Sequence, residues 1–168
     1  GTMERTGYEE FDYDARLDVA LSSSTTLTVA HQRVQQDDVW RTHNTLFFEP
    51  WHGTSLSNPD LARVYDQDRD LSYVRLAGEQ SGGFADEYHL TLSYQDSTED
   101  FERDRLRSGN TQVQLDRTTV ATIGAALAFE SKLGAGRLVY GIDYYRDDVD
   151  SRTRVVTFDP AGTLLTDV

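Results

Sequence analysis

The residues best suited to bind a solute lie in segment 36–70, between two stretches of alternating polar and apolar residues. Aromatic rings on a long connection can stack on a flat or apolar solute, and imidazoles can coordinate haem iron or another metal. The same rings could instead pack against one another. The histidines could serve only as hydrogen-bonding groups, since the segment has no His-x-x-His spacing. The candidate residues are Trp40, His43, Phe47, Phe48, Trp51, His52 and Tyr65.

Three aspartates, Asp66, Asp68 and Asp70, have the spacing with which a calcium-binding loop begins. An EF-hand is excluded, because its sixth position is Leu71 instead of glycine and its twelfth is Ala77 instead of glutamate. A looser calcium site, shared with a second acidic segment, stays open, and so does a solvated acidic loop. The second segment would supply Asp147, Asp148 or Asp150.

The sequence contains no arrangement typical of an active site. It has neither a Gly-x-Ser-x-Gly elbow nor a phosphate loop, and neither His31 nor His89 has a nucleophile at a recognisable spacing. We therefore expect no enzyme activity and no cofactor other than calcium in the loops. A formal net charge of −13 argues against a nucleic-acid partner, and the absence of cysteine excludes disulfides and thiolate metal sites.

Alternation of polar and apolar residues with a period of two predicts an all-β chain. In segment 87–95, for example, Leu90 and Leu92 share one face while Thr91 and Ser93 share the other. No apolar run approaches the ~18 residues that a membrane-spanning helix needs. The expected strands, about six in number, lie near 13–21, 26–34, 71–78, 87–95, 119–130 and 137–146.

The connections between these strands alternate in length. The short ones are 22–25, 78–86 and 131–136, and the long ones are 36–70, 96–112 and 147–168. In an antiparallel meander, alternate connections lie at the same end. The pattern therefore predicts part of a transmembrane β-barrel with short periplasmic turns and long extracellular loops. The mixed charges of 99–107 suit a solvated surface or pairing with lipopolysaccharide phosphates through divalent ions.

Which side of the strands faces outward is left open by alternation alone. A soluble barrel or sandwich would bury the apolar faces and expose the polar ones. Aromatic residues near strand ends favour a membrane, because such rings suit the bilayer interface. They are Tyr13, Tyr88, Tyr94, Phe129 and Tyr144.

Several stretches resemble strands of TonB-dependent outer-membrane receptors that rise into an extracellular loop. They are Tyr140–Ser151 (YGIDYYRDDVDS), Phe11–Leu21 (FDYDARLDVAL) with the SSST turn and LTVAHQ after it, and Tyr88–Gln95 followed by the charged segment 99–107. The resemblance, of strand and loop texture more than of an invariant motif, covers roughly residues 8–151.

The resemblance implies a barrel of about 22 strands around a plug, in the outer membrane of a Gram-negative bacterium. It also implies uptake of a scarce large solute, such as a ferric siderophore or another metal chelate, powered by the TonB complex. Because no plug and no TonB box can be recognised, we expect residues 1–168 to form a partial barrel domain, a fragment of a longer transporter. Its partners would be membrane lipid, lipopolysaccharide, the solute and, through the missing plug, TonB. The alternative is a soluble or surface ligand-binding β-domain.

Overall fold

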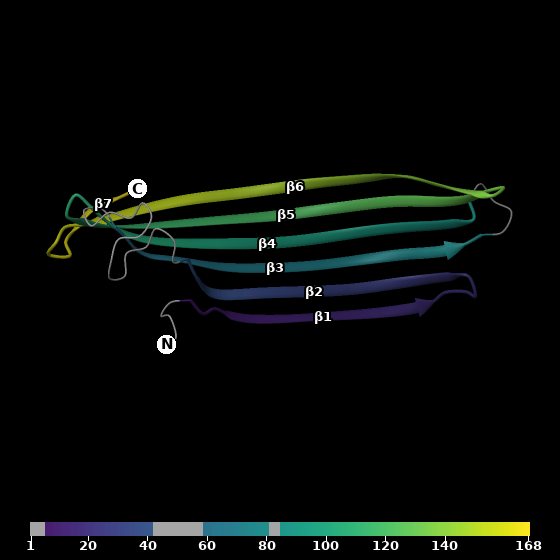
Figure 1. The fold of residues 1–168 in the computed structure, drawn as a ribbon, viewed down its shortest axis with the longest axis horizontal. Coiled ribbons are helices and arrows are strands. Elements are labelled where there is room, and N and C mark those ends of the chain that lie inside the picture. The colour runs from purple at the N-terminus through teal and green to yellow at the C-terminus, as the bar shows by residue number, and fades with distance from the viewer. Residues whose placement is uncertain (1–5, 42–58, 81–84) are drawn as a thin grey trace.

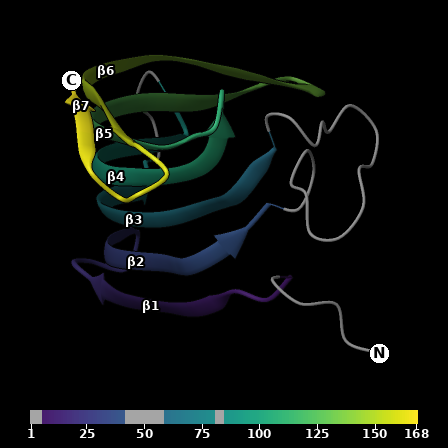
Figure 2. The same cartoon turned by 90° about the vertical axis from the view of Figure 1, so that its left-hand side faces the viewer.

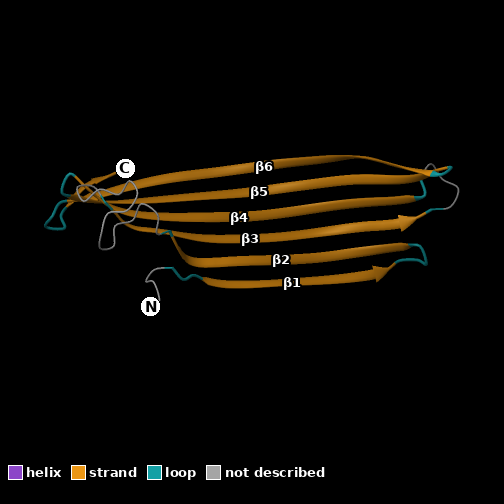
Figure 3. Ribbon diagram, viewed as in Figure 1, coloured by secondary structure: helices purple, strands orange, loops and turns teal. Residues whose placement is uncertain are grey.

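The computed structural model describes residues 6–41, 59–80 and 85–168. They form one antiparallel sheet in which every strand pairs with the next along the chain (Figures 1 and 3), so the predicted all-β meander is confirmed. No helix in the described part of the chain is long and apolar enough to cross a bilayer. The strands are β1 (Glu9–Ala20), β2 (Thr25–Trp40), β3 (Asp60–Glu79), β4 (Glu87–Arg107), β5 (Asn110–Leu133), β6 (Gly136–Phe158) and β7 (Leu164–Asp167).

Each expected strand lies in an observed one, apart from Leu21 just after β1, but most of the observed strands are much longer and continue past the predicted ends near 34, 71, 95, 119 and 146. β5 has 24 residues and therefore extends about 80 Å. The predicted long connection 96–112 is wrong: β4 and β5 pair along all of it and are joined by a turn at Ser108 and Gly109. Both turn residues have positive φ, 53° and 86°, as a type I′ hairpin requires. Short strand β7 was also missed.

The connections between the strands lie at two ends of the sheet, a proximal and a distal end. The proximal end holds the connections after β1, β3 and β5; the distal end, on the left in Figure 1, holds those after β2, β4 and β6. At the distal end, the β6–β7 turn is fixed by Asp159, whose Oδ1 accepts hydrogen bonds from the amides of Ala161 (2.9 Å) and Thr163 (2.7 Å). These hydrogen bonds hold the pKa of the Asp159 carboxyl below its usual range.

The sheet has an apolar face and a polar face over its proximal half. Strand register places Leu17, Val29, Val74, Leu92, Ala125 and Tyr144 in one row across β1 to β6 on the apolar face. The adjacent row on the polar face is Asp18, Thr28, Arg75, Thr91, Ala126 and Asp143.

The apolar face is not covered by the described part of the chain. Leu92 is 52% exposed and Ile142 is 72% exposed. No large side chain is fully buried among the described residues, and the buried apolar residues are only Ala30, Ala85 and Val156. The sheet therefore lacks the packed core that a soluble sandwich requires.

The polar face is the more sheltered of the two. Thr28 and Ala30, which point to it, are each 6% exposed, whereas Val29 between them is 44% exposed on the apolar face. Viewed along the strands, the sheet is curved and twisted, with β1 and β6 at its margins (Figure 2). We infer that the polar face is the concave one.

Both margins of the sheet are open within the described residues. No described strand pairs with the outer edge of β1, and β7 pairs only with the last residues of β6, Val156 to Phe158. Exposed ladder groups of this length normally pair with further strands. The sheet is thus not a closed barrel.

Candidate binding surface at the distal end

The structure separates the two predicted aromatic residues that it describes. Tyr65, in β3, lies on the polar face opposite Phe101 of β4, whereas Trp40 ends β2 on the apolar face, opposite Val64. The other five candidates, His43, Phe47, Phe48, Trp51 and His52, lie outside the described residues.

A β-bulge causes this separation. Gln36 pairs with Gln67, but the next pair is Val39 with Tyr65, so β2 contains one residue more than β3 in this interval. Asp38 has a φ of 57°, and its amide donates a 2.8 Å hydrogen bond to Oδ1 of Asp66. One extra residue reverses the face on which every later side chain lies.

Tyr65 and Phe101 form a stacked cross-strand pair on the polar face. Their ring centroids are 4.5 Å apart and their planes differ by 28°. The guanidinium carbon of Arg41 lies 5.4 Å from the Tyr65 centroid, and that of Arg63 lies 5.8 Å from the Phe101 centroid. Both distances allow cation–π attraction. We call these four residues the aromatic–arginine cluster.

Further arginines follow on the same face toward the distal end. Nη2 of Arg103 donates hydrogen bonds to both carboxylate oxygens of Asp60, at 2.8 and 3.1 Å, and Asp60 is only 6% exposed. Arg105 donates a 2.7 Å hydrogen bond to Gln112. Its pKa is lowered first by burial and then by the positive charges of Arg103 and Arg107. Positive charge is therefore concentrated here, although the chain as a whole carries −13.

Sequence reasoning missed Phe101, Arg41 and Arg63. Phe101 lies inside the run of charges 99–107, which was interpreted as a solvated loop. The available signal was that Phe101 and Tyr65 are isolated aromatics in otherwise charged segments. Their pairing depends on the β3–β4 register, which the sequence does not display.

The opposite face at the distal end carries acidic side chains on β3 and β4 and arginines on β5 and β6. A hollow of about 900 Å³ there is bordered by Trp40, by Asp66 and Asp100 on β3 and β4, and by Arg117 and Arg152 on β5 and β6. Burial raises the pKa of Asp104, which also borders it.

The structure does not bring the candidate calcium ligands together. Arg33 binds Asp68 at 3.2 Å and Asp70 at 3.0 Å, and Asp66 accepts the amide of Asp38. Asp147, Asp148 and Asp150 lie on β6, three strands away, which is a distance of about 14 Å. Among the described residues, no group of three histidine or acidic side chains could hold a metal ion.

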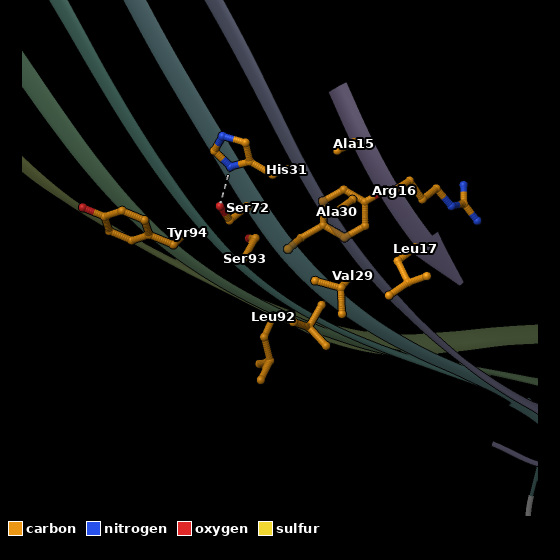
Figure 4. Close-up of a pocket in the computed structure, with 12 residues that line it drawn as sticks. Ala15, Arg16, Leu17, Val29, Ala30, His31, Ser72, Leu92, Ser93 and Tyr94 are labelled. Carbon is orange, nitrogen blue, oxygen red and sulfur yellow. Dashed lines mark hydrogen bonds between the residues drawn. The ribbon is translucent and has the colours of Figure 1, made fainter. Parts of the chain in front are cut away.

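A second, shallower hollow of about 640 Å³ lies on the proximal half (Figure 4). Leu17, Val29 and Leu92 line one side of it, and His31 donates or accepts a 2.9 Å hydrogen bond with Ser72 on the other. This pair could not be recognised from the sequence, because the two residues are 41 positions apart.

The His31 network does not have the features of an acyl-transfer site. The other ring nitrogen of His31 is 3.0 Å from the Tyr13 hydroxyl and 3.5 Å from Asp70. Ser72 lies in mid-strand, where the ladder engages the neighbouring backbone amides, so they are not available as a paired oxyanion hole. The network instead satisfies polar groups on an otherwise apolar surface.

Comparison with known proteins adds no assignment to this geometry. No protein-family model matches the chain, and no curated protein matches it.

Proposed function

We propose that this chain is a section of the wall of an outer-membrane transporter of the TonB-dependent type. In this proposal, the apolar face meets lipid, the polar face lines the lumen, and the distal end meets the solute outside the cell. The solute is scarce and large, such as a ferric siderophore. The chain's role is binding and passage, without catalysis.

The observation that carries the proposal is the wide exposure of the apolar face. Burying a Leu or Ile side chain is worth about 1.5–3 kcal/mol, so a soluble domain would cover such side chains. Here Leu92, Leu138 and Ile142 are exposed and meet no second sheet or helix among the described residues. A bilayer supplies the missing cover.

The height of the apolar face supports a bilayer as that cover. On β1 and the turn after it, the face extends from Phe11 to Leu21, which is about 33 Å along the strand. With a strand tilt of about 40°, this becomes about 25 Å, the height of the apolar band in outer-membrane barrels. The band is shorter on the neighbouring strands: on β4 it extends from Tyr88 to Tyr94, about 20 Å along the strand and about 15 Å after the tilt, with Phe129 and Tyr140 in the same row as Tyr88.

The partners follow from the same placement. Membrane lipid covers the apolar face, and lipopolysaccharide meets the charged surface distal to it, where Arg117 and Arg152 lie. The open edges of β1 and β6 pair with further strands of the same barrel, because an unpaired ladder in lipid costs several kcal/mol per group. The plug that contacts TonB would lie outside these residues.

Solubility tests the proposal most directly. We expect the 168-residue chain to remain in solution only with detergent or lipid. A cooperative, monomeric, detergent-free protein would contradict the proposal and favour a soluble ligand-binding β-domain. Growth of a deletion strain on defined iron, cobalamin or glycan sources then tests transport and identifies the solute, and unchanged growth on all of them would oppose an uptake role.

A further inference from the structure

We infer that the aromatic–arginine cluster binds an anionic part of the solute that carries flat aromatic rings. The inference rests on the proposed function, because it identifies the chemical class of solute that the same transporter takes up.

The charge of the site is the first argument. Arg41, Arg63, Arg103 and Arg105 lie on one face within a short distance along the strands, and the buried Asp60 is paired with Arg103. A guanidinium forms planar, paired hydrogen bonds with carboxylate-like groups, and charge-assisted bonds of this kind are about twice as strong as neutral ones. The site therefore favours anions in a chain whose overall charge repels them.

The ring pair is the second and independent argument. Tyr65 and Phe101 are stacked side by side and lie only partly buried, with a guanidinium near each ring. A flat ligand ring can extend this stack while its negative groups meet the arginines. Alternation of ring and guanidinium thus matches a ligand in which rings and anionic oxygens are adjacent, as in a catecholate.

The position of the cluster is the third argument. It lies on the polar face at the distal end, on the strand segments beyond the apolar band. A solute that enters the lumen from outside would pass this surface first. The opposite face at the same height, with Asp66 and Asp100, has no comparable ring pair among the described residues.

The experiment separates charge from stacking with three ferric complexes, titrated calorimetrically into the full chain in detergent. A hexadentate ferric tris-catecholate is trianionic and carries rings, ferric tris-oxalate has the same charge without rings, and a ferric tris-hydroxamate is neutral. We expect affinity to fall in that order. Equal binding of all three, or no binding of any, would overturn the inference.

Variants locate the binding. Arg63→Gln should weaken the tris-catecholate about tenfold and the oxalate similarly, because both lose a charge contact. Phe101→Leu should weaken only the tris-catecholate, by about fivefold. The matched control Arg117→Gln, which removes the same charge from the opposite face, should change neither by more than about twofold. Far-UV circular dichroism confirms that each variant keeps its strands.

Two outcomes distinguish this inference from the proposed function. If Arg63→Gln and Arg117→Gln weaken tris-catecholate binding equally, in a chain that still needs detergent, the proposed binding site is refuted but the membrane role is not. A chain that is soluble without detergent and still prefers the tris-catecholate keeps the site but removes the transporter.

Discussion

Replacing Leu92 by arginine tests which side of the sheet meets lipid. Leu92 lies on β4 between Tyr88 and Tyr94, at about the middle of the apolar band. An arginine at the bilayer midplane on the lipid face of a barrel costs about 2–4 kcal/mol. We therefore expect Leu92→Arg to lower the folded-to-unfolded ratio by a factor of about 30 or more. In a water-soluble protein, the same change at a position that is already 52% exposed would cost no more than about 0.5 kcal/mol.

The matched control is Ala126→Arg, which introduces the same charge at nearly the same height on the other face. Ala126 pairs with Asp143 of β6, so the new guanidinium has an acidic neighbour and lies in a solvated environment on the polar face. The assay is urea unfolding of each variant in lipid vesicles, followed by tryptophan fluorescence and by the gel mobility of the unheated protein. Our reasoning fails if the two variants lose equal stability, or if Leu92→Arg is as stable as the parent chain.

Three further predictions concern the distal end. Asp60→Asn should lower the free energy of local opening at the start of β3 by about 2 kcal/mol, measured by amide exchange, because Arg103 loses a buried charged hydrogen-bond partner. The control Asp100→Asn loses only an exposed 3.6 Å ion pair with Arg117 and should change amide exchange little. The lowered pKa of Asp159 means that its stabilisation of the β6–β7 turn is complete above the usual carboxyl range and disappears as pH falls through the lowered value. The protection factors of the turn amides, which are corrected for the intrinsic exchange rate, should fall only in that acid window, and Asp159→Asn should abolish this fall. Gly109→Ala should destabilise the β4–β5 hairpin by about 1 kcal/mol, because φ is +86° there; unchanged thermal unfolding of the hairpin would contradict this reason.

The proximal half of the sheet could be predicted because its physics is local. Where one face must be apolar, as with Leu90 and Leu92 against Thr91 and Ser93, the residue types alternate with the period of two that indicates a strand. The tight 22–25 and 131–136 connections were recognisable for the same reason, since the alternation stops there.

The distal half could not be predicted because both of its faces are polar. Segment 99–107 alternates acidic and basic residues, which is typical of solvated loops, and its strand character comes from pairing with β3 and β5 along its whole length. Such pairing is non-local. Cross-strand partners such as Asp60 with Arg103, which are 43 residues apart, replace the apolar pattern as the source of register.

The bulge at Asp38 shows how one residue decides what the binding surface contains. Without it, the register of Gln36 with Gln67 would continue, so Trp40 would pair with Arg63 instead of Val64 and would join the aromatic–arginine cluster. With the bulge, positions 40 and 64 are opposite each other on one face, whereas position 63 lies on the other face. Because the chain has no cysteine, engineered pairs report the register cleanly: Trp40→Cys with Val64→Cys should form a disulfide, and Trp40→Cys with Arg63→Cys should form none. A disulfide in the Trp40→Cys, Arg63→Cys pair and none in the other would show that β2 and β3 pair without the bulge, with Trp40 on the same face as Tyr65.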